Sequence, residues 1–229
     1  MVVSDVERGA PVIDAHELYR FFHIGDDETF ALRGVSLRVG SSEFVAIVGP
    51  SGSGKSTLLS CMAGLDEPDG GWVSVAERRI TRRPEAVRAS LRASWIGVLL
   101  QSGNLLEHLD VRENVAAAQA LSAGGSRPDP HELLDQVGLA ARRNARPSTL
   151  SGGEAARAGI AVALANDPAV VLADEPTGEV DAETERIVLE RLRQRTEQDR
   201  AVVVVTHSER VAAAADRVVR LVDGRVVDG

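Results

Sequence analysis

Hydrophobic and polar residues alternate over much of the first part of the chain. VIDAHELYRF (12–21) and TFALRGVSLRV (29–39) show the period of two that is typical of half-buried strands. EFVAIVG (43–49) is instead a continuous apolar run, which favours a strand buried on both faces. Further strand candidates lie at 72–80 and 95–100. The pattern therefore predicts a chain that begins mainly with β structure.

The stretch from about residue 102 to 165 has a different period. VRENVAAAQALSA (111–123), PHELLDQVGLA (130–140) and GGEAARAGIAVALA (152–165) are rich in Ala and Leu with helical spacing. The segments GGSRPDP and RRNARPSTLS between them are rich in turn residues. This region is predicted to be a helical lobe inserted into an α/β core.

Strand and helix patterns then alternate to the end of the chain. AVVLAD (169–174) and AVVVVTH (201–207) are buried-strand patterns, separated by a predicted helix over about 181–197. A short Ala-rich helix follows, and RVVRLVDGRVVDG is predicted to form a hairpin with Asp223 and Gly224 at its turn. Alternating strands and helices of this kind predict an α/β protein.

Composition limits the class of protein. The chain has 229 residues with 44% hydrophobic and 26% charged residues, enough for a single domain with a core. Its net charge of -8 argues against nucleic-acid binding. No apolar run approaches the roughly 18 residues of a spanning helix, and the N-terminus lacks a signal-peptide pattern. The single cysteine, Cys61, fits a reducing compartment, so we expect a cytoplasmic protein with a buried thiol.

The segment GPSGSGKS (49–56) fits the phosphate-binding pattern G-x-x-x-x-G-K-[ST], between a predicted strand and a predicted helix. Backbone amides of such a loop bind the α- and β-phosphates, the Lys55 ammonium reaches the β,γ-oxygens, and the Ser56 hydroxyl is a Mg²⁺ ligand. Lys55 is the only lysine among 26 basic residues. The predicted nucleotide-binding loop consists of Gly49, Pro50, Ser51, Gly52, Ser53, Gly54, Lys55, Ser56 and Thr57.

Two carboxylates follow the buried strand in VVLADEP (170–176). Asp174 is a candidate metal ligand, directly or through water, and Glu175 is placed to polarise an attacking water. His207 ends another buried strand. A lone histidine at a strand end is more often structural, and His207 becomes a candidate only because of the motifs that accompany it.

A second candidate anion site lies at LSGGE (150–154), directly before a predicted helix. A serine followed by two glycines at a helix N-terminus has the form of a phosphate cradle. The chain already has a more complete phosphate-binding loop at residues 49–57, so the presence of two candidate phosphate sites needs an explanation.

In their order and spacing, GPSGSGKST, LSGGE, VVLADEPTG and VVVVTH resemble the ATP-binding subunit of ABC transporters, over nearly the whole chain. NLLEHLDVRENV and LADEPTGEVD look like the subgroup of lipoprotein-releasing, macrolide-export and cell-division ATPases. The resemblance implies a P-loop NTPase (RecA-like) core with an N-terminal antiparallel β-subdomain and an inserted α-helical signature subdomain. Within a single domain, 1–229, it implies a β-subdomain at about 1–40 with part of 70–80, a core at about 41–101 and 166–229, and a helical subdomain at about 102–165.

The resemblance also answers the question of duplication. It implies an ATPase that uses ATP and Mg²⁺ and works as a head-to-tail dimer of two copies. Ser151, Gly152 and Gly153 of one copy would then donate to the γ-phosphate of the nucleotide on the other, which a second helix N-terminus can stabilise.

Further roles follow from matching positions in the family's motifs. Gln101 matches a glutamine expected near Mg²⁺ and the attacking water, Asp181 an aspartate at the dimer seam, and His207 a histidine that contacts the γ-phosphate. Phe22 is expected to stack on adenine, and strand alternation puts it on the face opposite Tyr19 and Phe21, which are assigned to the core.

One departure from the family pattern is visible after the signature. Ala155 and Ala156 replace the polar residues that relatives usually carry there. Alanine favours helix, so the Ser-Gly-Gly turn should be retained. Polar contacts from those two positions to the rest of the dimer or to a membrane partner are thereby put in question.

The resemblance implies a separately encoded membrane permease as partner, docked near 101–115, with this chain on the inner face of the cell membrane. An alternative is an ATPase that regulates a cell-envelope or cell-division membrane partner without transport. ABC ATPases of DNA or ribosomes carry a coiled-coil insertion or tandem cassettes, which are not present here. A small-molecule P-loop kinase leaves LSGGE and VVVVTH unexplained.

Overall fold

The computed structural model describes residues 10–24, 27–122, 127–178 and 180–228. Its N-terminal part is an antiparallel four-stranded sheet in the order β2-β1-β4-β5. The strands of this sheet are β1 (Ile13–Ile24), β2 (Asp27–Val39), β4 (Gly70–Val75) and β5 (Arg78–Arg79).

A six-stranded sheet in the order β10-β9-β3-β8-β7-β6 forms the centre of the molecule. Its strands are β3 (Phe44–Val48), β6 (Ile96–Leu99), β7 (Val170–Asp174), β8 (Ala201–Val205), β9 (Arg217–Val222) and β10 (Arg225–Asp228). All neighbours pair in parallel except β10, which forms the predicted hairpin with β9. Asp223 and Gly224 have φ of 47° and 72°, as the tight turn of such a hairpin requires.

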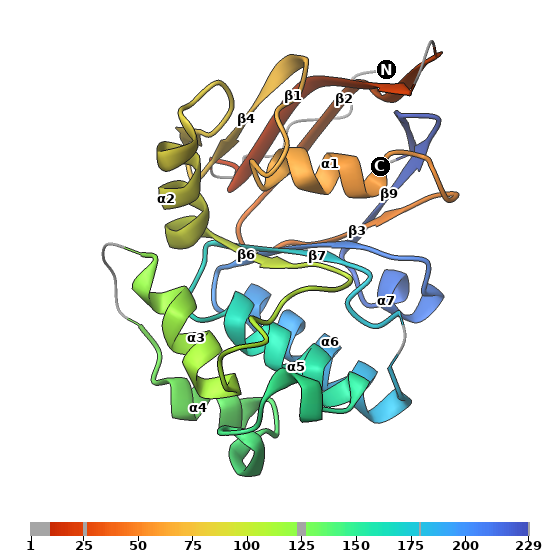
Figure 1. The fold of residues 1–229 in the computed structure, drawn as a ribbon. Helices are drawn as coiled ribbons and strands as arrows, with labels where there is room; N and C mark the ends of the chain where they lie inside the picture. Colours follow the sequence, from red (N-terminus) through yellow and green to blue (C-terminus); the bar gives the residue numbers. More distant parts are fainter. Residues whose placement is uncertain (1–9, 25–26, 123–126, 179, 229) are drawn as a thin grey trace.

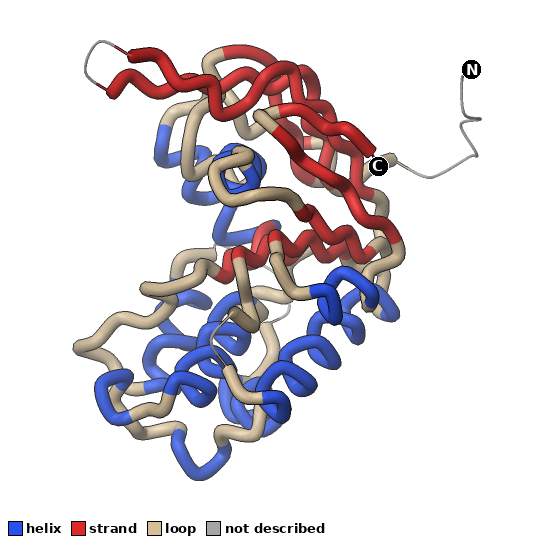
Figure 2. Tube along the Cα trace, turned by 90° about the vertical axis from the view of Figure 1, so that its right-hand side faces the viewer, coloured by secondary structure: helices blue, strands red, loops and turns tan. Residues whose placement is uncertain are grey.

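Helices cover both faces of the central sheet. Figure 1 shows α1 and the antiparallel sheet on one face and α3 to α7 on the other, and Figure 2 shows these two layers on either side of the central sheet from a second direction. The helices are α1 (Lys55–Met62), α2 (Glu85–Trp95), α3 (Val111–Ala120), α4 (Pro130–Gln136), α5 (Gly152–Ala163), α6 (Ala182–Glu197) and α7 (Glu209–Ala213). Short 3₁₀ turns lie at Ala140–Arg142 and Pro147–Thr149.

The continuous apolar strands serve two separate cores. Val170 and Leu172 of β7 point into the core shared with α1 and the antiparallel sheet. Val171 and Ala173 point into the core under α3 to α7. Because successive strand residues face opposite sides, a strand covered on both sides must be apolar throughout.

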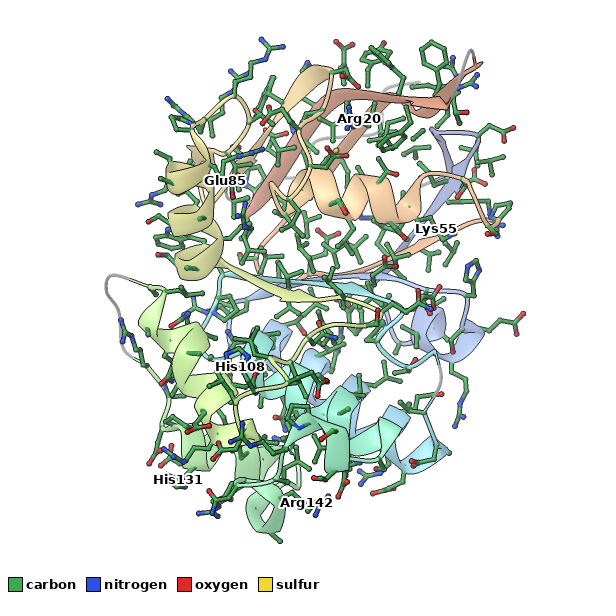
Figure 3. All side chains as sticks on the ribbon, in the orientation of Figure 1. Arg20, Lys55, Glu85, His108, His131 and Arg142 are labelled. Carbon is green, nitrogen blue, oxygen red and sulfur yellow. The ribbon has the colours of Figure 1, made fainter. Side chains whose placement is uncertain are left out.

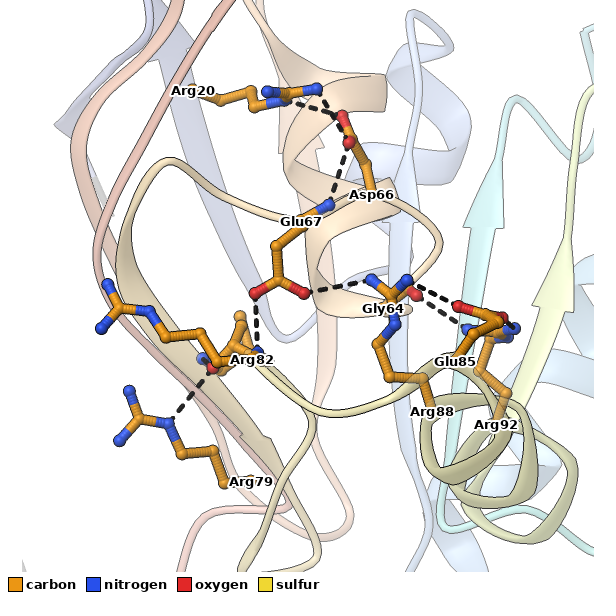
Figure 4. Close-up of polar contacts among 11 residues, drawn as sticks. Arg20, Gly64, Asp66, Glu67, Arg79, Arg82, Glu85, Arg88 and Arg92 are labelled. Carbon is orange, nitrogen blue, oxygen red and sulfur yellow. Dashed lines mark hydrogen bonds and ion pairs between the residues drawn. The ribbon is translucent and has the colours of Figure 1, made fainter.

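Helix α2 was not anticipated from the sequence pattern. It buries no residue fully, and its inward side combines two partly buried apolar residues, Leu91 and Trp95, with two arginines. Arg88 lies 3.0 Å from a Glu67 oxygen, and Arg92 donates to the Gly64 carbonyl at 2.7 Å (Figure 4). Arginine stems pack while their charged ends are paired, so a helix whose inner side is only partly apolar is harder to recognise from its sequence.

Two expectations about Trp95 and Tyr19 are wrong. Trp95 was placed in a strand at 95–100, but it is the last residue of α2. Tyr19 was assigned to the core, yet it is 44% exposed. The pairing of β1 with β2 shifts register between Leu18 and Tyr19 and again between Arg20 and Phe21. Such irregularities re-aim side chains, which invalidates a simple alternation.

Cys61 is fully buried in α1, and burial raises the pKa of its thiol to about 12. Because the thiolate is the reactive form, we expect Ellman's reagent to leave Cys61 unmodified in the native protein. Stoichiometric labelling should appear only after unfolding in denaturant. Rapid labelling of the native chain would contradict the buried position.

Candidate active site

The predicted chemical groups meet at one edge of the central sheet. The loop after β3, Gln101 after β6, Glu175 after β7 and His207 after β8 all follow the carboxyl ends of parallel strands. This is the edge at which open α/β sheets bind ligands. Figure 3 shows Lys55 there, at the start of α1, and His108 and His131 on the helical side of the central sheet.

A cavity of about 490 Å³, here called the P-loop cavity, opens at this edge. It brings together eleven of the residues selected from the sequence, which are Phe22, Ser51, Gly52, Gly54, Lys55, Ser56, Thr57, Gln101, Asp174, Glu175 and His207. Thr29 and Ala31 of β2 also line it. No motif indicated these two, since they come from a strand remote in sequence from the loop.

The loop is built to leave its amides free at the start of α1. Gly54 is the N-cap at φ 98°, and no side chain caps this helix. A Cβ at Gly54 would lie 2.2 Å from the Ala31 carbonyl oxygen, so only glycine fits. An uncapped helix N-terminus facing a cavity is a site for a phosphate group.

Lys55 is held by the loop itself. Its Nζ donates to the carbonyl oxygens of Gly49 at 3.0 Å and Pro50 at 2.8 Å. Burial lowers the pKa of Lys55, and the charges of Glu175 and Asp174 oppose that shift. Lys55, Asp174 and Glu175 all line the P-loop cavity, where the two carboxylates favour the ammonium form of Lys55.

Gly49, Pro50 and Ser53 do not line the cavity. Gly49 and Pro50 provide the carbonyls that hold Lys55. Ser53 is buried, its amide donates to Pro50 at 3.2 Å, and its carbonyl accepts from Gly224 at 3.1 Å. These residues shape the loop, and Ser53 ties it to the β9-β10 turn.

Glu175 has an unusual backbone conformation and a carboxylate oxygen that accepts no hydrogen bond. Its φ is 46°, in the left-handed region that costs energy for a residue with a Cβ. Its amide donates to Val205 at 2.9 Å, and its Oε2 accepts from the His207 amide at 3.3 Å. Its Oε1 is buried without a hydrogen bond, 3.5 Å from His207 Nε2. This acceptor fits a water molecule that needs a base.

The oxygen donors of the cavity fit a magnesium ion. Ser56, Gln101 and Asp174 bring a hydroxyl, an amide and a carboxylate to it. Among the residues that the structure describes, no group of three or more His, Cys, Asp or Glu side chains could hold a metal alone. Mg²⁺ normally takes one or two protein ligands and completes its shell with phosphate and water, so this donor set suits it.

The second cradle lies outside the P-loop cavity. Ser151 is the N-cap of α5 in a capping box, where its Oγ accepts from the Glu154 amide at 3.2 Å and its amide donates to Glu154 Oε2 at 2.9 Å. Its hydroxyl proton remains available to a ligand. Ser151, Gly152, Gly153 and Asp181 do not line the P-loop cavity.

Asp181 is the N-cap of α6. Its carboxylate accepts from the amide of Thr184 at 2.9 Å and from the Thr184 hydroxyl at 3.0 Å. These two hydrogen bonds hold the pKa of Asp181 below its usual value.

A second cavity of about 510 Å³, here called the Gln101 groove, adjoins the P-loop cavity. Its lining includes Leu100 and Leu105 and the two small residues Ala155 and Ala156 of α5. Gln101 and Glu175 line both cavities. A molecule bound in the groove would therefore lie next to residues that also line the P-loop cavity.

This fold, with its phosphate loop and paired carboxylates at the sheet edge, defines a P-loop NTPase. The family model described as "ABC transporter" matches residues 32–178. Together with the relatives below, this match shows that the chain belongs to the ABC transporter family, as an ATP-hydrolysing cassette.

Two curated relatives and one solved structure illustrate the similarity. The lipoprotein-releasing ATP-binding protein LolD of Acinetobacter baylyi is 40% identical, over 95% of this chain and 97% of its own length. The macrolide export ATP-binding/permease protein MacB of Rhodospirillum rubrum is 42% identical, but the chain spans only 34% of its length. The dimeric bacterial cassette MJ0796 superposes with a TM-score of 0.87 at 33% identity, covering 94% of this chain and 97% of that one.

A related structure of MJ0796 is a post-hydrolysis dimer bound to ADP and Pi, with a TM-score of 0.88 and 32% identity.

Across its described residues, this chain has no helix with the length and apolarity needed to cross a membrane.

Proposed function

We propose that two copies of this chain bind Mg²⁺-ATP head to tail, each nucleotide between the P-loop of one copy and Ser151, Gly152 and Gly153 of the other. The observation that carries the proposal is the separation of the two cradles. The chain builds a second set of donors at α5 and leaves it outside its own P-loop cavity. A second copy is the simplest way to bring both sets to one phosphate, and the dimeric MJ0796 structures support it.

In this proposal each residue has one task. The amides at the start of α1 and Lys55 hold the phosphates, and Phe22 stacks on the base. Ser56, Asp174 and Gln101 hold Mg²⁺, which neutralises charge on the phosphates. Glu175 accepts a proton from the attacking water, while His207 keeps that carboxylate in place and faces the γ-phosphate.

Both chains hold the nucleotide only while its γ-phosphate is present, so hydrolysis opens the dimer. This motion involves three proposed subdomains. They are a β-subdomain at about 1–40 with part of 70–80, a core at about 41–101 and 166–229, and a helical subdomain at about 102–165. A separate membrane permease would take up this motion through the Gln101 groove and residues 101–115. The chain would then sit on the cytoplasmic face of the membrane, as the LolD and MacB similarities suggest. The same cycle of ATP binding and hydrolysis would drive a membrane partner that transmits a mechanical signal without transporting a substrate.

Lys55 offers a direct test of ATP binding because it is the only lysine of the sequence. The amines that acetic anhydride can acetylate in this sequence are the Lys55 side chain and the N-terminal amine. The N-terminal amine serves as an internal control. At ATP about 100 times above its dissociation constant, the Lys55 rate should fall about 100-fold while the N-terminal rate is unchanged. Mass spectrometry measures both rates. Equal Lys55 labelling with and without Mg²⁺-ATP would refute nucleotide binding at this loop.

A further inference from the structure

Arg20 of β1 lies over the ring of Phe22, two residues further along the same strand. The central carbon of its guanidinium group is 4.6 Å from the centroid of that ring. A guanidinium over an aromatic face is attracted by the negative charge of the π-system. A charged side chain therefore packs against the residue that is proposed to stack on the base.

Arg20 is itself held in place by two carboxylates. Its Nε and Nη2 donate to the two oxygens of Asp66 at 2.9 and 3.0 Å (Figure 4), and its Nη1 donates to Asp69 Oδ2 at 3.1 Å. The pair with Asp66 is bidentate, a geometry that fixes the plane of the guanidinium group. Only 21% of the Arg20 side chain is exposed. The guanidinium is thus oriented before any nucleotide binds.

The two carboxylates belong to the segment that follows α1. The Asp66 amide donates to the Ser60 carbonyl in the last turn of that helix at 3.2 Å. Asp69 Oδ2 also accepts from the Phe21 amide of β1 at 3.0 Å. The backbone directly before Phe22 is therefore attached to the same helix whose N-terminus forms the phosphate site.

Phe22 keeps part of its ring open to the P-loop cavity. It lines that cavity and is 38% exposed, although Arg20 covers one face of the ring. Because an aromatic ring has two faces and the guanidinium occupies one, a flat base can stack only on the other. A cation on one face also draws electron density toward itself, which reduces the repulsion between the π-electrons of the ring and those of a stacked base.

We propose that Arg20 is a positioning residue for nucleotide binding. It holds the ring of Phe22 so that the base stacks on the uncovered face while the phosphates occupy the loop at the start of α1. Arg20 acts through the ring and does not touch the nucleotide. This inference rests on the proposed function, because it needs Phe22 to contact the base.

The chain provides a matched control for the loss of such a contact. Arg78 stands over the Trp95 ring at 4.4 Å, and neither residue lines the P-loop cavity. Arg20→Met and Arg78→Met both replace a guanidinium over an aromatic ring by an uncharged, unbranched side chain. Only the first removes a contact of Phe22.

The experiment measures the dissociation constants of Mg²⁺-ADP and Mg²⁺-pyrophosphate by isothermal titration calorimetry. Pyrophosphate has two phosphates and no base, and neither ligand requires turnover. Arg20→Met should raise the dissociation constant of ADP about 2- to 5-fold, the range expected for a partly exposed cation–π contact, and leave that of pyrophosphate unchanged. Arg78→Met should change neither constant. A merely structural role, in which loss of Arg20 loosens α1, would weaken both ligands alike and contradict the proposal.

A double-mutant cycle with Phe22→Ala shows whether Arg20 acts through the ring. Phe22→Ala should raise the dissociation constant of ADP about 5- to 100-fold, the range for loss of a base-stacking contact. Adding Arg20→Met to that variant should cause no further change, because the ring through which Arg20 acts is absent. A further loss of about 2- to 5-fold in the double variant would mean that Arg20 acts without Phe22, which refutes the proposal.

Asp66→Asn is a second variant, and it keeps both Arg20 and Phe22. It weakens the bidentate pair, while its amide oxygen can still accept from the Glu67 amide, as Asp66 Oδ1 does at 2.9 Å. It should weaken ADP and not pyrophosphate, and it decides the test alone if Arg20→Met does not fold. Wild-type ADP affinity in every folded variant of Arg20 and Asp66 refutes the positioning role. Unchanged ADP affinity in Phe22→Ala would instead overturn the base contact of the proposed function, and this inference with it.

Discussion

The Glu175→Gln variant is expected to lose ATP hydrolysis by a factor of about 10² to 10⁴. The amide is nearly the same size as the carboxylate and can still accept from the His207 amide, which now bonds Glu175 Oε2 at 3.3 Å. It cannot take a proton from water. The phosphate-binding groups are unchanged, so ATP affinity should remain close to the wild-type value.

The loss of turnover has a second consequence. Without hydrolysis the γ-phosphate remains, so Mg²⁺-ATP should convert the Glu175→Gln chain from monomer to stable dimer, measured by size-exclusion chromatography with light scattering. Glu183→Gln is the matched control, because Glu183 is 65% exposed and pairs with Arg186 on the surface of α6. The control should hydrolyse ATP normally. Turnover near the wild-type rate in Glu175→Gln would remove Glu175 from the catalytic role.

Mixing two inactive variants should restore activity. Lys55→Ala disables the P-loop and Ser151→Arg blocks the signature turn, so each should lose about 10² to 10³ in rate when alone. In a heterodimer the intact P-loop of one chain faces the intact turn of the other. One complete site then forms and one doubly damaged site remains.

Restored activity has an upper limit. An equal mixture forms heterodimers for about half of its dimers, each with one site of two, so activity reaches at most about a quarter of wild type. Thermal melting of each variant establishes that it folds, since Ser151 caps α5. Normal hydrolysis by either variant alone would contradict the shared site.

Local features of this protein could be predicted from the sequence. The hairpin turn at Asp223 and Gly224, the loop before α1 and the apolar strands all follow from short-range patterns. The edge position of Gln101, Glu175 and His207 follows too, because each comes directly after a buried parallel strand. These features are determined by residues close together in the chain.

Features that depend on distant residues were not predictable. The strand order β10-β9-β3-β8-β7-β6 is set by how layers pack, and no local pattern encodes it. Helix α2 packs through two paired arginines as well as Leu91 and Trp95, and a β1 irregularity exposes Tyr19. The bond from Arg157 to Thr184 spans two helices and involves a hydroxyl with no motif of its own.

The central claim is that one γ-phosphate is bound from two chains. A crystal structure of Glu175→Gln with Mg²⁺-ATP measures it directly. We expect a two-fold dimer in which Ser151 Oγ and the Gly153 amide lie at hydrogen-bond distance from the γ-phosphate on the partner's P-loop. A structure with ATP bound at Lys55 but with residues 151 to 153 of every copy away from any nucleotide would contradict the account.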